Sequence, residues 1–228
     1  GFERQNWFDN NAAEHRAVRE AVGVFEQSSF GKILVQGRDA ERVLNHIATS
    51  DMAVPVGRVV YTHFLNKRGG VEADLTISRL ADDKYLILTP AFTVTHIKAW
   101  LHDHTPADAC CVVTDVSGAW AMLNVQGPRA RDLMRAISSA NFDHQAFPYA
   151  TWQNVEIGFQ TALCMRVSYT GEIGYELYIP TEMALPVYDQ LVAAGADFGL
   201  AHCGYHTLNT VRVEKAFREW AHDMGPLD

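Results

Sequence analysis

The sequence lacks any apolar stretch long enough to cross a membrane. It has 228 residues, of which 48% are hydrophobic and 20% charged, an ordinary balance for a globular protein. No run approaches the roughly 18 apolar residues that a spanning helix needs, and residues 1–20 are polar, without the apolar centre of a secretory signal. We therefore expect no membrane partner, and the chain can bury one large core or two small ones.

The sequence also lacks cysteines at C-x-x-C spacing and clusters of basic residues. The four cysteines, Cys110, Cys111, Cys164 and Cys203, form no C-x-x-C pair, which predicts reduced thiols in a reducing compartment. The formal net charge is −8, from 19 basic and 27 acidic residues, and no block of Lys and Arg occurs. A surface for a phosphate backbone is therefore not expected, which argues against nucleic acid as a partner.

Common catalytic and cofactor signatures are absent too. There is no G-x-S-x-G turn for a nucleophilic serine and no G-x-G-x-x-G after a strand for a dinucleotide. His202, Cys203 and His206 lie close in sequence, as do His102 and His104, but no second pair has the spacing of a four-ligand zinc site. We predict no metal site and interpret these histidines as surface or helix-end residues.

What the sequence does contain is an internal repeat. Residues 35–47, VQGRDAERVLNHI, recur 90 positions later as residues 125–137, VQGPRARDLMRAI. The same offset carries residues 85–90 onto 175–180, and an apolar-periodic segment follows each of them. Chance similarity is the alternative. The repeat predicts an α+β fold of two related units, with antiparallel sheets about a pseudo-twofold axis.

Apolar periodicity and turn residues predict the individual elements. We expect Asn11 to cap the first helix and Asp39 to cap the second. The expected helices cover residues 11–22, 92–101, 183–192 and 204–220, and the expected strands cover residues 30–35, 59–65, 71–78 and 85–88.

Residues 163–180 predict a β-hairpin, with alternating apolar residues on either side of a turn that contains Gly171 and Gly174. Glu176 does not suit an ordinary hairpin, because it lies in an apolar and aromatic strand where an unpaired carboxylate is costly. Such a carboxylate faces water, is paired, or awaits a ligand, and the hairpin pattern alone leaves all three open.

The repeat separates Glu176 and Asp74 from the rest of the pattern. The counterpart of Glu176 at the 90-residue offset is Leu86, and the counterpart of Asp74 is Cys164. Each half therefore carries one carboxylate, on an apolar strand, that the other half lacks. Positions that break a pattern kept elsewhere are where function is expected, although two edge-strand carboxylates facing water would also explain them.

Together with Tyr169, these carboxylates suit a flat ring. A carboxylate can accept hydrogen bonds from two adjacent N–H donors, as on the guanidine-like edge of a pterin or a guanine. A tyrosine beside it offers a face on which such a ring can stack. The residue types indicate this chemistry without identifying a ligand.

Several motifs together resemble the glycine-cleavage aminomethyltransferase (T-protein) superfamily. They are Tyr169-Thr170-Gly171-Glu172-x-Gly174-Tyr175-Glu176, Gly69-Gly70-x-x-x-Asp74-Leu75, Val125-Gln126-Gly127-Pro128 and Arg212-Val213-Glu214. Residues 3–8, 24–32 and 214–220 are similar to the folate-binding portion of the dimethylglycine and sarcosine dehydrogenases. The resemblance runs in order through nearly the whole chain.

The resemblance implies three subdomains around a tetrahydrofolate site, of which two would be present here. We expect the first, discontinuous, at residues 1–50 plus 146–228 and the second at residues 51–145. A C-terminal β-rich domain and an upstream FAD domain would lie outside this chain. The chain begins without Met and ends just after a helical pattern, so we expect it to be part of a longer protein.

The resemblance also implies residue roles. Asp74 would be the catalytic carboxylate beside the reactive nitrogens of the folate, and would contact that cofactor. Glu176 would grip the pterin edge, and Tyr169 would lie beside it. An iminium or formaldehyde unit from a small methylated amine would be captured on N5, with Asp74 stabilising positive charge and relaying a proton and Glu176 fixing the ring.

The implied protein is a folate-dependent transferase, and oxidoreductase activity would need the FAD-containing domain of the same parent chain. The implied location is the cytoplasm in a bacterium or the mitochondrial matrix in a eukaryote. Leu208, Ser168 and Ala73 replace an arginine, a glycine and an aspartate of the glycine-cleavage enzymes. These departures fit the dehydrogenase-linked branch and argue against lipoyl-dependent glycine cleavage.

Three other functions stay open on the sequence. One is a folate-binding regulatory module without transfer chemistry, and another is a folate-dependent demethylase of the same superfamily. The third is a structural α+β domain that has kept no site.

Overall fold

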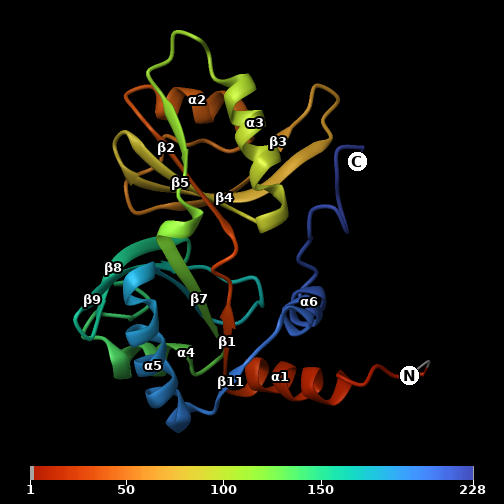
Figure 1. Ribbon diagram of the computed structural model, residues 1–228, viewed down its shortest axis with the longest axis vertical. Helices are drawn as coiled ribbons and strands as arrows, with labels where there is room; N and C mark the ends of the chain where they lie inside the picture. The colour runs from red at the N-terminus through yellow and green to blue at the C-terminus, as the bar shows by residue number, and fades with distance from the viewer. Residues whose placement is uncertain (1–2, 228) are drawn as a thin grey trace. The chain divides into compact units, whose positions relative to one another are not determined.

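The computed structural model describes residues 3–227, which form two compact units. The first unit comprises the described residues within 1–28 together with 120–149 and 153–217. The second comprises 29–119, 150–152 and the described residues within 218–228. Each unit is built on one sheet with its own helices (Figure 1). The predicted α+β class is therefore confirmed.

The first unit contains a six-stranded sheet in the order β11-β1-β7-β10-β9-β8. Strand β1 is antiparallel to β7, β7 to β10 and β10 to β9, whereas β1 and β11 are parallel. The strands are β1 (Val22–Glu26), β7 (Trp120–Gln126), β8 (Thr151–Ile157), β9 (Gln160–Arg166), β10 (Gly174–Pro180) and β11 (Leu200–His202). The helices are α1 (Phe8–Glu20), α4 (Ala130–Ile137), α5 (Ala184–Gly195) and α6 (Tyr205–Glu214).

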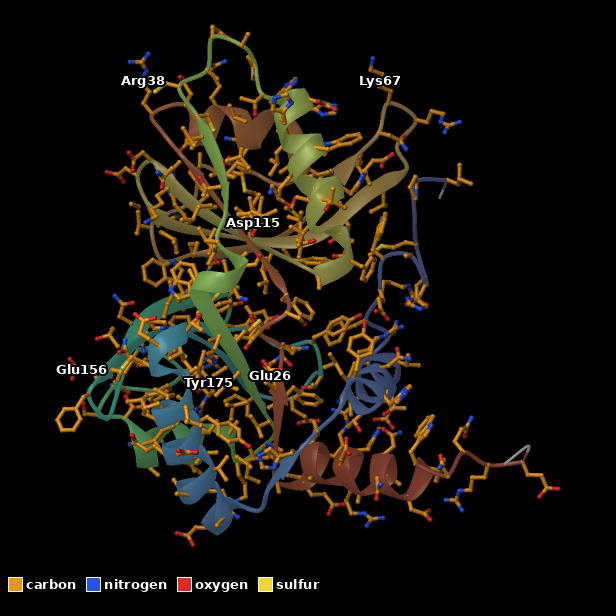
Figure 2. All side chains as sticks on the ribbon, viewed as in Figure 1. Glu26, Arg38, Lys67, Asp115, Glu156 and Tyr175 are labelled. Atoms are coloured by element: carbon orange, nitrogen blue, oxygen red, sulfur yellow. The ribbon has the colours of Figure 1, made fainter. Side chains whose placement is uncertain are left out.

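The core of the first unit lies between its sheet and the helices α4 and α5. Val125, Tyr175 and Leu177 on the strands are fully buried in one cluster with Leu133 of α4 and Leu191 of α5. Figure 2 labels Tyr175 among the side chains of this unit. Since successive strand residues point to opposite faces, the residues that alternate with this set lie on the other face of the sheet.

The second unit contains a five-stranded sheet in the order β3-β4-β5-β2-β6, with every neighbouring pair antiparallel. Its core packs one sheet face against α2 and α3. The strands are β2 (Gly31–Gln36), β3 (Val59–Leu65), β4 (Val71–Ala81), β5 (Lys84–Thr89) and β6 (Val112–Asp115). The helices are α2 (Ala40–Ile47) and α3 (Val94–His104).

The 90-residue repeat appears in the structure as equivalent elements. Helices α2 and α4 have eight residues each and begin 90 positions apart, as do the single 3₁₀ turns Ala91–Thr93 and Thr181–Met183 that precede α3 and α5. Gly37 and Gly127, just before α2 and α4, have φ values of 135° and 136°. An added Cβ would lie 2.2 Å and 2.4 Å from a backbone carbonyl oxygen at these two positions, which requires glycine at both.

Two strands pair outside their own repeat. Strand β1 precedes β2 in the chain but pairs with β7, and β6 precedes β7 but pairs with β2. The pairing of β2 with β5 places residues 29–50 in the second unit, and the pairing of β7 with β10 places residues 120–145 in the first. The observed units have other boundaries than the subdomains expected at residues 1–50 plus 146–228 and 51–145, and both observed units are discontinuous.

Several local expectations need correction. Helix α1 begins at Phe8, and the side chain of Asn11 accepts a hydrogen bond from the Thr207 hydroxyl instead of capping the helix. Asp39 accepts from the amide of Cys110 and makes no side-chain cap to α2. Helix α6 ends at Glu214, well before residue 220, because Ala216 adopts a positive φ of 58°, which a right-handed helix does not allow.

Candidate functional site

Glu176 is a buried carboxylate in the middle of β10, with 7% of its surface exposed. It pairs across the sheet with Asn124 on β7 and Met165 on β9, on the face opposite the core. The Tyr178 hydroxyl donates a 2.7 Å hydrogen bond to its Oε2 atom. Burial raises the pKa of Glu176 to about 7, and the bond from Tyr178 partly opposes that rise.

Within the part of the chain that the structure describes, Glu176 has no cationic partner, and Tyr178 is its one hydrogen-bond donor. A carboxylate can accept several hydrogen bonds, so this one keeps most of its accepting capacity. A buried carboxylate without a cation is costly. Its free accepting capacity could be filled by hydrogen-bond donors of a ligand.

Tyr169 lies in the loop between β9 and β10, in the same unit as Glu176. Its ring stacks on Phe217, with 5.9 Å between ring centroids and 23° between planes. It packs against a small cluster of buried residues, Val18, Phe25, Leu208 and Val211. Phe25 pairs with Asn124 across the sheet, and Asn124 pairs with Glu176. Phe25 of this cluster and Glu176 therefore lie in one row across the sheet, with their side chains on the same face.

Arg19 of α1 holds the Tyr169 loop in place. Its guanidinium donates to the carbonyl oxygen of Thr170 at 2.7 Å and to the Glu172 carboxylate at 2.9 Å, both in the loop. It also donates to the carbonyl oxygen of Val211 at 2.8 Å and to Glu214 at 3.0 Å, both on α6. One side chain thus joins α1, α6 and the loop.

Asp74 belongs to the second unit, on β4, where it lies directly opposite His63 on β3. Its neighbours Ala73 and Leu75 are part of the core, so Asp74 lies on the opposite face. Burial is the main cause that raises the pKa of Asp74 above its usual value, and Glu219 raises it further. A hydrogen bond from Tyr61 and the charge of His63 act in the other direction.

The three predicted site residues are thus divided between the units. Tyr169 and Glu176 belong to the first unit, and Asp74 belongs to the second, with a polar cluster of its own. Among residues 3–227, no group of three or more His, Cys, Asp or Glu side chains is arranged to hold a metal ion. In the same part of the chain, no helix combines the length and apolar character of a membrane span.

Sequence reasoning missed Tyr178, Asn124 and Arg19. Tyr178 could have been found, because residues two apart in a strand share a face and Tyr178 follows Glu176 at that spacing. Asn124 could have been found through the repeat, since its counterpart at the 90-residue offset is Leu34. No sequence signal points to Arg19, whose partners are 151 or more positions away.

The whole chain, residues 1–228, matches the family described as the GCVT N-terminal domain. A solved structure, the glycine cleavage system aminomethyltransferase T from Bartonella henselae, superimposes with a TM-score of 0.83. It covers 95% of this chain, which spans 57% of the solved one, at 23% identity. This similarity establishes the shared fold.

Three curated relatives span the chain at higher identity. The 4-methylaminobutanoate oxidase (formaldehyde-forming) of Paenarthrobacter nicotinovorans is 44% identical over 100% of this chain and 27% of its own length. The mitochondrial pyruvate dehydrogenase phosphatase regulatory subunit of Mus musculus is 35% identical over 99% of this chain and 26% of its own length. The mitochondrial sarcosine dehydrogenase of the same species is 36% identical over 93% of this chain and 25% of its own length.

The chain therefore spans about a quarter of the length of these relatives. The resemblance to the T-protein superfamily and to the dehydrogenase-linked branch is confirmed by the family match, by these identities and by the shared fold. The chain belongs to the GCVT N-terminal domain family.

Proposed function

We propose that this chain is a tetrahydrofolate-binding module that transfers one-carbon units in a protein related to the dimethylglycine and sarcosine dehydrogenases. The observation that carries the proposal is Glu176, a buried carboxylate that, among the described residues, has one hydrogen bond from Tyr178 and no cation beside it. Such a group fits a ligand whose edge presents two adjacent N–H donors, because charge-assisted, bidentate hydrogen bonds would compensate its burial. A reduced pterin presents that edge.

Tyr169 and Glu176 would hold the ring. Glu176 fixes its orientation by accepting from the N–H edge, and Tyr169 offers an aromatic face beside it. Bound tetrahydrofolate supplies a nucleophilic nitrogen that accepts the one-carbon unit. The Arg19 contacts keep the Tyr169 loop in one position, so that the loop need not be ordered when the ligand binds.

Asp74 is proposed as the catalytic carboxylate and as a further contact of the folate. Its negative charge would stabilise the positive charge on an incoming iminium, or the positive charge that develops as a formaldehyde unit reacts. The raised pKa of Asp74 brings its protonation closer to neutral pH, and a group with such a pKa is suited to relaying a proton.

The rest of the parent protein is proposed from its relatives. An FAD-containing domain of the same chain would oxidise a small methylated amine and so supply the one-carbon unit. The relative from Paenarthrobacter nicotinovorans is named as an oxidase of a methylated amino acid that forms formaldehyde. By analogy with other relatives, the protein would act in the bacterial cytoplasm or, in a eukaryote, in the mitochondrial matrix.

Tetrahydrofolate titration by calorimetry under anaerobic conditions tests the proposal. The unchanged protein should bind, and Glu176→Gln should weaken binding roughly 10- to 100-fold, because a charge-assisted hydrogen bond contributes about 1.5–3 kcal/mol. The matched control is Glu156→Gln, an exposed glutamate of β8 in the same unit. Absence of binding by the unchanged protein, or equal affinity in both variants, would overturn the proposal.

A regulatory folate-binding module is the second candidate, since one relative is named as a regulatory subunit. Asp74→Asn separates the two. A transferase should lose capture of formaldehyde on tetrahydrofolate in this variant while keeping most of its folate affinity. A protein with folate affinity but no capture activity before the substitution is the regulatory module. Assays of methyl donors with the full-length protein address the folate-dependent demethylase.

A further inference from the structure

The two units offer an internal comparison at the level of strand register. Leu34 on β2 pairs with Leu86 on β5, and 90 positions later Asn124 on β7 pairs with Glu176 on β10. The two strand pairs are therefore equivalent, residue by residue. Because the second unit forms this strand pair with leucines, the fold does not require polar side chains at these positions.

The first unit replaces three of these leucines by polar residues on one sheet face. Asn124, Glu176 and Tyr178 stand where the second unit has Leu34, Leu86 and Leu88. All three polar residues are buried, and burying polar groups without a reason is unfavourable. Two of them belong to the candidate site already described, and Asn124 is the third member of the set.

The loop that carries Tyr169 is also longer than its equivalent. In the second unit, residues 79–85 separate Ser78 from its partner Leu86. In the first unit, residues 166–175 separate Met165 from Glu176, which is the corresponding pair. Ten residues therefore stand where the other unit has seven. The constant 90-residue offset predicted Cys164 as the counterpart of Asp74. Because of this insertion, that prediction is wrong: Cys164 and Asp74 do not occupy equivalent positions in the two sheets.

A chain of buried hydrogen bonds joins Asn124 to the Tyr169 loop. The Asn124 amide donates to the Gln27 side-chain oxygen at 3.0 Å, and its own oxygen accepts from Gln126. The Gln126 side-chain oxygen accepts from the Thr170 hydroxyl at 3.0 Å. All four side chains are buried, with at most 7% exposed, and Thr170 directly follows Tyr169. The chain is confined to the first unit.

We propose that Asn124 is a positioning residue that orients the Glu176 carboxylate for its ligand. Residues directly opposite on antiparallel strands have Cβ atoms about 5 Å apart, so Asn124 forms the wall beside Glu176. Hydrogen bonds on both sides hold its amide in one orientation, and buried polar networks of this kind rigidify their members. Through Gln126 and Thr170, the same chain fixes the loop of Tyr169.

This inference rests on the proposed function, and its test compares two ligands. One is tetrahydrofolate, and the other is its analogue with hydrogen in place of the 2-amino group, which lacks a donor for Glu176. Asn124→Leu introduces the residue found at the equivalent place in the second unit. It should weaken tetrahydrofolate binding about tenfold but change the affinity for the analogue less than twofold. The matched control is Asn154→Leu, at an exposed position of β8.

The outcomes distinguish the two proposals. No binding of tetrahydrofolate by the unchanged protein overturns the proposed function itself. If that protein binds and Asn124→Leu weakens both ligands equally, or neither, Asn124 has a purely structural role and the inference is wrong. Gln27→Met removes only the outer acceptor of the chain, so it decides the matter if Asn124→Leu does not fold. It should weaken tetrahydrofolate binding less than Asn124→Leu does and leave the affinity for the analogue unchanged. An equal loss for both ligands, or no loss for either, would overturn the inference.

Discussion

The Tyr178 hydroxyl donates a 2.7 Å hydrogen bond to the Glu176 carboxylate two positions earlier on β10. Both groups are buried and both lie on the sheet face opposite the core. The bond favours the ionised form of Glu176, whereas burial favours the neutral form. Because burial is the larger effect, the pKa of this carboxyl is near 7, and its protonation changes in the range where most proteins are studied.

Replacing Glu176 by Gln should therefore stabilise the ligand-free protein, in a pH-dependent way. The pKa is about 7 in the folded state and 4.5 without burial, so the folded state binds the proton more tightly. Stability due to Glu176 is then present at low pH and is lost as pH rises from about 4.5 to 7. The Gln variant does not ionise, so its advantage should grow to about 3 kcal/mol above pH 7.

Urea unfolding at pH 4.5, 6 and 7.5 measures this difference in unfolding free energy. Glu156→Gln serves as the control, because the exposed glutamate of β8 should show no such trend. An advantage of Glu176→Gln that is the same at all three pH values would mean that ionisation of Glu176 is not its cause.

Tyr178→Phe should raise the pKa of Glu176 beyond 7. It removes the hydrogen bond from Tyr178 that favours the ionised carboxylate, and it leaves in place the burial that raises the pKa. Carbon-13 NMR titration of the side-chain carboxyl measures the midpoint directly. Tyr175→Phe is the control, because Tyr175 points to the core on the other sheet face. A lower midpoint in Tyr178→Phe would contradict the role given to this bond.

Much of the fold could be predicted from the sequence, because the repeat preserves both apolar spacing and turn glycines. The strand and helix at 35–47 and 125–137 lie where the pattern placed them. The exchange of β1 and β6 could not be predicted, since periodicity shows that a strand exists but not which strand it joins. The observed unit boundaries follow from that pairing.

The candidate site shows the same limit. Glu176 stood out because its apolar surroundings made a carboxylate unexpected, and it is indeed buried. Asn124 did not stand out, because a polar residue that alternates with apolar ones is typical of a strand with one face in water. Its burial depends on hydrogen bonds to Gln27 and Gln126, which the sheet register brings together. Such contacts are properties of the tertiary structure.

Arg19→Gln should loosen the Tyr169 loop and destabilise the first unit. The substitution leaves the carbonyl oxygens of Thr170 and Val211 without this donor and removes the ion pairs with Glu172 and Glu214. Buried acceptors that lose their partner cost about 1–3 kcal/mol each, so we expect a loss of roughly 2–4 kcal/mol. Denaturant unfolding measures the loss, and hydrogen exchange should show weaker protection at residues 167–173.

Arg16→Gln on the same helix is the control for that variant, because Arg16 is exposed and surface substitutions usually change stability by less than about 0.5 kcal/mol. If the amides of residues 167–173 exchange at the same rate in both variants, Arg19 does not hold the loop.

Gly174→Ala should break the buried amide chain by a steric route. An added Cβ at Gly174 would lie 2.0 Å from the side-chain oxygen of Gln126, which is fully buried and accepts a hydrogen bond from Thr170. The amide cannot move away without losing that bond, so we expect a cost of roughly 1–3 kcal/mol.

Gly118→Ala is the control, since its added Cβ meets nothing within 4 Å. Thermal unfolding compares the two, and equal stability would show that Gln126 can move without cost. Weaker hydrogen-exchange protection of residues 167–173 in Gly174→Ala alone would link the chain to the Tyr169 loop.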